Sequence, residues 1–138
     1  MYAANGVDTD LELALFTADH GRAEDLPRAV AQARAQVAVR PSIVAWDVLA
    51  WTLYRSGDFD GAAAASKEAL HLGTQNALMR FHAGMIAAAR GETEQATSFL
   101  ESALALNPHF SVRFAPEARA TLERLRAIPS AGEETHEQ

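Results

Sequence analysis

Small and apolar residues recur along this chain at helical spacing, and alanine dominates them. Alanine is the best helix former, and β-branched residues are sparse. Boundary signals accompany the pattern: Thr9 and Glu12 are spaced as a capping box, and Pro41 and Pro108 mark helix ends. Together they predict seven helices, at about 9–20, 25–39, 42–56, 60–72, 76–90, 93–106 and 115–127.

The pattern repeats with a period of 34 residues. Gly57 and Gly91 are 34 positions apart, and each falls between two predicted helices. The same offset joins further pairs of small or apolar residues: Ala50 and Gly84, Ala62 and Ala96, Ala69 and Ala103, Leu70 and Leu104, Leu72 and Leu106. Such a period predicts an array of helical hairpins.

A degenerate unit precedes these two. Its second helix aligns at an offset of 33, from Ala29 to Ala62, and its first at an offset of 36, from Ala14 to Ala50. The difference indicates an insertion of three residues in the turn 21–27. At the other end, the helix expected at 115–127 aligns with first helices only, which is typical of a cap that ends such an array.

These units resemble the tetratricopeptide-repeat (TPR) family. The stretch 46–50 reads as the W-x-x-L-A opening of a first helix, 57–60 reads as the G-D-F-D turn, and 107–108 reads as the closing Asn-Pro. The third unit departs from the family at Arg80, where a tryptophan is usual, and at Thr93, where the turn has an aromatic residue.

The resemblance implies an all-α fold, a right-handed TPR superhelix of about three helix-turn-helix repeats with a C-terminal capping helix. We expect one domain over 1–129 and a disordered acidic tail over 130–138. The repeats are expected at about 8–41, 42–76 and 77–110, and the capping helix at about 115–127. The ends of the array are similar to those of bacterial TPR proteins, including the C-terminal parts of longer ones.

The family places groove-lining side chains at positions 2, 5, 9, 12 and 13 of each first helix. Carried onto helices that begin at Ile43 and Ala77, these positions supply the candidate binding residues Asp47, Trp51, Tyr54, Arg55, Phe81 and Met85. Two interpretations stay open. Either the groove is free to bind a peptide, with Trp51 and Tyr54 as anchors, or Trp51, Phe81 and Met85 are covered by neighbouring first helices or by the cap.

Composition narrows the function. The net charge is −6 and Lys67 is the single lysine, so a basic face for nucleic acid is not expected. The chain has no cysteine, which excludes disulfides, zinc–thiolate sites and cysteine nucleophiles. The first residues do not have the pattern of a signal peptide, and no apolar run is long enough to span a bilayer. A cytoplasmic protein is therefore expected.

Candidate chemistry is sparse. None of the five histidines has a metal-binding spacing, and there is no glycine-rich phosphate loop. His20 ends a helix, where a cation complements the dipole. His82 could reach the groove edge, but no motif supplies a nucleophile for it. We therefore expect no enzymatic activity, no metal and no cofactor.

The leading hypothesis is a non-catalytic module that binds a peptide or helix of another protein in the concave groove. Groups typical of a clamp for a C-terminal carboxylate are not present at the groove positions. Groove composition equally allows two alternatives. The first is a structural unit that assembles with itself or docks onto further repeats, and the second is a binder of a hydrophobic small molecule.

Overall fold

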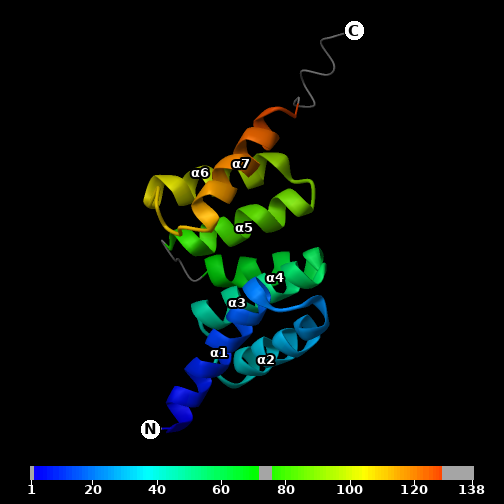
Figure 1. Cartoon of the computed structure of the whole chain (residues 1–138), viewed down its shortest axis with the longest axis vertical. Helices are drawn as coiled ribbons and strands as arrows, with labels where there is room; N and C mark the ends of the chain where they lie inside the picture. The colour runs from blue at the N-terminus through cyan, green and yellow to red at the C-terminus, as the bar shows by residue number, and fades with distance from the viewer. Residues whose placement is uncertain (1, 72–75, 129–138) are drawn as a thin grey trace. The chain divides into compact units, whose positions relative to one another are not determined.

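The chain is described by a computed structural model that covers residues 2–71 and 76–128, with side chains from Leu11 onward. The described residues form seven α-helices and no strand (Figure 1). The helices are α1 (Tyr2–His20), α2 (Leu26–Val39), α3 (Ile43–Ser56), α4 (Phe59–His71), α5 (Ala77–Ala89), α6 (Thr93–Leu106) and α7 (Phe114–Arg126). The predicted all-α class and the positions of the helices after α1 are confirmed. The predicted tail, 130–138, lies outside the described residues.

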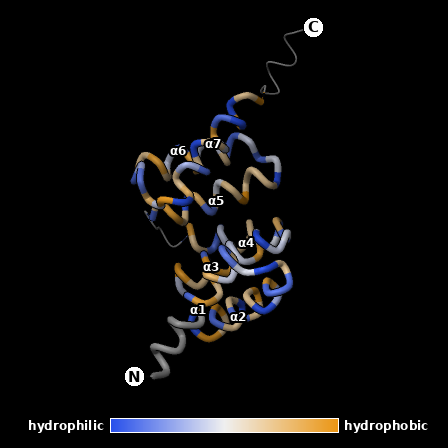
Figure 2. Tube along the Cα trace, in the orientation of Figure 1, coloured by the Kyte–Doolittle hydropathy of each residue, from blue (hydrophilic) through white to orange (hydrophobic). Residues whose placement is uncertain are grey.

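The chain divides into two compact units, residues 1–75 and residues 76–138. In the first unit α1 packs against α2, and both contact α3, which forms a hairpin with α4. In the second unit α5 and α6 form a hairpin, and α7 packs against both. Along the helices of each unit, hydrophobic and hydrophilic positions alternate (Figure 2).

The two predicted interhelical turns have a common structure. Gly57 and Gly91 both adopt positive φ, of 92° and 78°, within two residues of the end of a first helix. In each turn the next residue donates its backbone N–H to a carbonyl in the last turn of that helix: Asp58 to Leu53, and Glu92 to Ala87. Glycine adopts this left-handed conformation without a steric penalty from a Cβ. The 34-residue period of the glycines is therefore the period of the helix reversals.

Small residues line the seams between paired helices. Ala62, Ala69, Ala96 and Ala103 are buried in the second helices of the two hairpins. In the second unit Gly84 of α5 lies directly against Leu100 of α6, and a Cβ built on Gly84 would come within 2.7 Å of the Leu100 side chain. Side chains this small let the helix backbones approach closely.

The start of α1 differs from the prediction. The capping box of Thr9 and Glu12 places the first helix at 9–20, whereas α1 already begins at Tyr2. Thr9 therefore lies inside a continuous helix and cannot cap its N-terminus. The sequence signal is local, and it does not prevent helical residues from preceding it.

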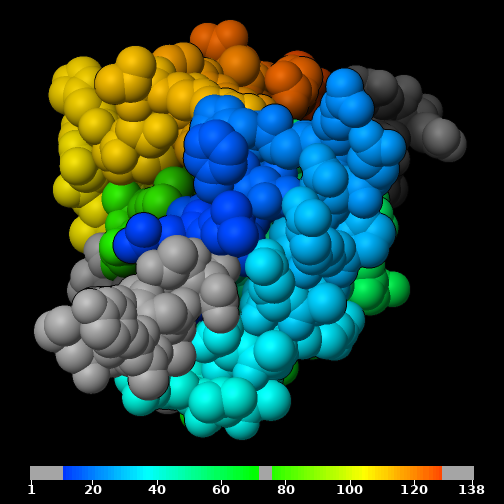
Figure 3. Space-filling view, turned by 60° about the horizontal axis from the view of Figure 1, so that its bottom comes forward, coloured from blue at the N-terminus to red at the C-terminus, as the bar shows by residue number. Residues whose placement is uncertain are grey.

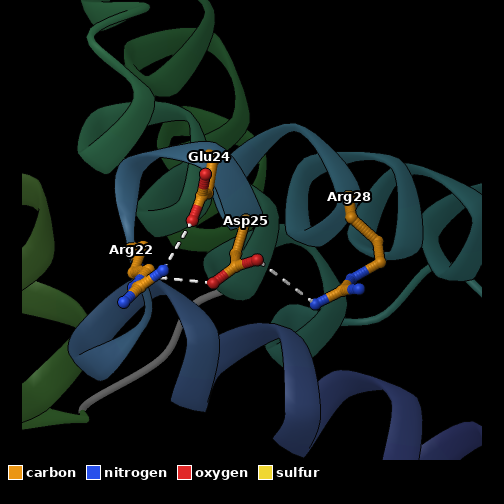
Figure 4. Close-up of polar contacts among 4 residues, drawn as sticks. All are labelled: Arg22, Glu24, Asp25 and Arg28. Atoms are coloured by element: carbon orange, nitrogen blue, oxygen red, sulfur yellow. Dashed lines mark hydrogen bonds and ion pairs between the residues drawn. The ribbon is translucent and has the colours of Figure 1, made fainter.

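The inserted turn between α1 and α2 contains a short 3₁₀ helix, Ala23–Asp25. Asp25 accepts a hydrogen bond from the Arg22 backbone N–H (3.2 Å) and forms an ion pair with Arg28 at 3.7 Å (Figure 4). Arg22 also pairs with Glu24 at 3.0 Å. The arginine side chains are mostly exposed, so each pair contributes at most about 1 kcal/mol. Pro27 lies in the first turn of α2, where a missing N–H has no cost.

The Gly84 contact gives a test of the small-residue seam. Gly84→Ala should lower the free energy of unfolding by about 1 kcal/mol, because Leu100 is fully buried and has little room to move. Alanine is the better helix former, so without the clash the change would stabilise the chain. Urea denaturation followed by circular dichroism measures the difference.

Gly61→Ala in α4 is the matched control. There the added Cβ meets the exposed carboxylate of Asp58, which accepts a hydrogen bond of 2.9 Å from the Gly61 N–H. Weakening of that bond is offset by the better helix propensity of alanine, so the change should stay within about 1 kcal/mol of the native stability. A Gly84→Ala variant as stable as the native chain would show that the seam tolerates a methyl group.

Candidate functional site

Four of the six candidate binding residues lie on α3 in the first unit, and the contacts of Trp51 dominate their arrangement. Trp51 is only 2% exposed. Its indole Nε1 donates a hydrogen bond of 2.7 Å to Oδ1 of Asp19, in the last turn of α1. The acceptor carries a charge, and hydrogen bonds of this kind are stronger than those between neutral groups. Trp51 therefore connects α3 to α1.

A second polar contact joins the same two helices. The Arg55 side chain donates through Nε to the backbone carbonyl of Ala18, at 2.8 Å. Carbonyl groups in the last turn of a helix receive no hydrogen bond from a backbone N–H of the same helix, so they can accept one from a side chain. A cation at this end also complements the helix dipole. Arg55 is nevertheless exposed, so part of the residue is accessible from solvent.

Tyr54 packs against neighbouring aromatic rings and keeps part of its surface accessible to solvent. Its ring stacks on Trp51, with the ring centroids 4.7 Å apart and the planes at 13°, and the ring of Phe59 on α4 lies 5.8 Å away. Tyr54 is half-buried, whereas Asp47 is buried. Of the four candidates on α3, Tyr54 and Arg55 are therefore the ones that solvent can reach.

The other two candidates, Phe81 and Met85, lie on α5 in the second unit, and both are buried. Phe81 has no exposed surface. Its ring stacks on Phe114 of the capping helix α7, at 5.0 Å, and also contacts Phe110 in the preceding loop, at 5.5 Å. The cap thus covers the face of α5 that carries Phe81.

These contacts bear on the two interpretations that the sequence leaves open. Trp51 is covered by α1, a neighbouring first helix, and Phe81 by the capping helix, as the second interpretation describes. Whether any of the six residues contacts a partner stays a prediction. Sequence reasoning missed Asp19, although the offset of 36 places it at the same repeat position as Arg55, which the family assigns to the groove.

The departure at Arg80 has a structural compensation. Arg80 occupies the position of the usual tryptophan, and its guanidinium group donates a hydrogen bond of 2.9 Å to the hydroxyl of Ser102 on α6. A polar contact between the paired helices α5 and α6 thus replaces part of the packing that an indole would supply.

An open recess of about 550 Å³ lies between α6 and α7 in the second unit. Its wall combines apolar and charged side chains: Glu101, Leu104, Ala105, Arg119, Leu122, Glu123 and Arg126. Arg126 and Glu101 form an ion pair at 2.8 Å, and Arg119 donates to the carbonyl of Pro108. Glu101, Arg119 and Arg126 therefore already bind one another or the backbone.

Among the described residues, no group of three or more histidine, aspartate or glutamate side chains is placed to hold a metal ion. His82 lies inside the second unit beside Phe81, and it is 1% exposed. His20 lies in the last turn of α1, as expected for a helix-capping role, and its ring is 4.8 Å from that of Phe16. Within the described ranges no helix has the length and hydropathy needed to cross a membrane.

Comparison with known proteins gives similarity in structure alone. No model of a protein family matches the chain, and no curated protein matches it. Among solved structures, the chain is similar to the type III secretion translocator chaperone SycD of Yersinia enterocolitica. One SycD structure has a TM-score of 0.71 at 19% identity, over 89% of this chain and 85% of SycD.

Two further SycD structures are similar to the same extent. SycD in complex with a peptide of the translocator YopD has a TM-score of 0.68 at 19% identity, over 88% of this chain and 93% of that one. An alternative SycD dimer has a TM-score of 0.69 at 20% identity, over 88% and 92%. At such identity the likeness establishes the fold, and this chain therefore has the TPR-like helical-repeat fold that SycD has.

Proposed function

We propose that this chain is a non-catalytic, cytoplasmic module that binds a peptide or helical segment of another protein along its first helices. The observation that carries the proposal is its likeness, over 88% of its length, to SycD in complex with a translocator peptide. An array of helical hairpins offers extended surfaces rather than an enclosed site, and such surfaces suit a chain-like ligand.

Within the first unit, the contacts divide the candidate residues into two roles. Trp51 is buried, and together with Asp19 it holds α1 against α3, so it supports the surface from beneath. Tyr54 and Arg55 lie at the edge of that surface and are accessible. An aromatic ring held by stacking loses little freedom on binding, and a guanidinium group offers several donors, so these two suit direct contacts.

In the second unit the candidates Phe81 and Met85 are buried, so we assign them the supporting role that Trp51 has in the first. Phe81 is enclosed by Phe110 and Phe114, so it would contact a partner only if the cap moved. Leu78 and Ala88, at the neighbouring groove positions of α5, are half-buried and therefore more accessible than Phe81 and Met85. We propose them as the accessible apolar residues of the corresponding surface in the second unit.

The proposal predicts that Tyr54→Ala and Arg55→Ala weaken peptide binding about tenfold each, because truncation of an aromatic or arginine contact to the peptide costs about 1–2 kcal/mol. The probe is a set of peptides selected on the native chain from a displayed random library. Isothermal titration calorimetry with the selected peptides then gives Kd for each variant.

Val112→Ser is the control, because Val112 is almost fully exposed in the loop before α7 and lies outside the groove positions. Its Kd should stay within about twofold of the native value. Failure to select any saturable peptide ligand, or peptides that bind both groove variants with native Kd, would count against the proposal.

The structural role assigned to Trp51 makes a separate prediction. Asp19→Ala removes the acceptor of a buried indole N–H and should lower the free energy of unfolding by about 1–3 kcal/mol. Glu12→Ala, on the exposed side of the same helix, should change it by less than about 0.5 kcal/mol. Urea denaturation compares the two variants, and equal stability would show that the Trp51 contact does not hold α1 in place.

A further inference from the structure

The recess between α6 and α7 shares no lining residue with the surface proposed above to contact a peptide. Its two walls are helix faces, and α6 and α7 lie side by side at the surface of the second unit, in yellow and orange in Figure 3. The α6 wall consists of Glu101, Leu104 and Ala105, and the α7 wall consists of Arg119, Leu122, Glu123 and Arg126. Both sets have the i, i+3, i+4 spacing of one helix face, so each wall is a continuous stripe.

The base of the recess is apolar. Leu122 is 4% exposed, the least of the lining residues, and Leu104 is half-buried. Ala105 is exposed and has no side chain beyond Cβ, so it leaves room between the helices. The recess has a volume of about 550 Å³ and is open to solvent, and two helix faces form it. Such a groove suits a third helix that inserts its apolar side.

Glu123 has the unpaired charge of this recess. Glu101 is bound to Arg126, and Arg119 is bound to the carbonyl of Pro108. Glu123 is exposed, and it makes no ion pair or side-chain hydrogen bond with any residue that the structure describes. A free carboxylate beside an apolar base favours a ligand in which a cation lies next to an apolar side chain.

The charge of the whole chain favours the same kind of ligand. The net charge is −6, which attracts a basic partner at long range, and a free carboxylate in the recess then selects where that partner docks. The chain's own residues 129–138 are a poor occupant. They include three glutamates and no lysine or arginine, and their apolar residues are one proline and one alanine.

We propose that the recess binds a basic amphipathic helix of another protein, with an apolar side chain on Leu122 and a lysine or arginine facing Glu123. Seven positions separate Arg119 from Arg126, so the α7 wall is about 10 Å long and the partner contributes about two turns. This interaction goes beyond peptide binding along the first helices. The two sites have no residue in common, so each can be altered while the other stays intact.

A synthetic helix of leucine and lysine, about 14 residues long, is the probe, and fluorescence anisotropy gives its Kd. The native chain should bind it saturably, and Glu123→Lys should raise the Kd about fivefold or more, because it replaces an attraction by a repulsion. Glu117→Lys is the matched control: it changes the net charge equally, and Glu117 is exposed on α7 outside the recess. Its Kd should stay within about twofold of the native value.

Circular dichroism checks that both variants stay helical, because Glu117 lies in the first turn of α7, where an acid complements the dipole. Absence of saturable binding would overturn the proposal. An equal loss in the two variants would do the same, since it would mean attraction to the chain's overall charge rather than to Glu123.

Filling the recess gives a test that leaves the charge unchanged. Ala105→Trp should raise the Kd at least about tenfold, because the indole takes the space of the inserted side chain. Ala120→Trp, at another exposed alanine on α7 outside the recess, is its control and should leave the Kd within about twofold. Binding by Ala105→Trp with native or lower Kd would contradict the proposed site.

Exchange of charge between the two partners tests the contact at Glu123 itself. A second peptide has glutamate in place of every lysine. It should bind Glu123→Lys about fivefold more tightly than it binds the native chain, and Glu117→Lys should gain less than about twofold. Equal gains in the two variants would show that no basic side chain of the ligand faces Glu123.

Discussion

The fold depends on close contact between helices that are joined by a tight reversal. Gly57 and Gly91 end two first helices in the left-handed conformation, and the chain turns back within a few residues. The returning helix can then lie near its partner only if small side chains face each other, as Gly84 does against Leu100. In the two hairpins both requirements are met by glycine and alanine at fixed spacing.

Polar contacts hold the first repeat against the hairpin of α3 and α4 in the first unit. The degenerate first repeat lacks the usual turn, and its two helices are joined by a longer connection with exposed ion pairs. Contacts through Trp51 and Arg55 place α1 against α3, and both use groups at the C-terminal end of α1. A hydrogen bond from a buried indole is costly to break, so this contact compensates for the weak local signal of the first repeat.

The first helices α1 and α3 therefore have different tasks. On α3, buried Trp51 supports a surface whose accessible groups are Tyr54 and Arg55. On α1, Asp19 meets Trp51, while Phe16 and Leu13 are exposed to solvent.

The sequence by itself determined the hairpins. The glycine period, the small residues and the prolines locate the helices after α1 to within about two residues, because these signals act through local backbone geometry. It also placed Trp51 and Phe81 at the positions that the family assigns to a groove. Tertiary structure alone decided that Asp19 and Phe114 cover them, because burial depends on neighbours far away in the chain. For the same reason the exposure of Phe16 could not be read from a helical pattern: an apolar residue looks the same in sequence whether or not a preceding helix covers it.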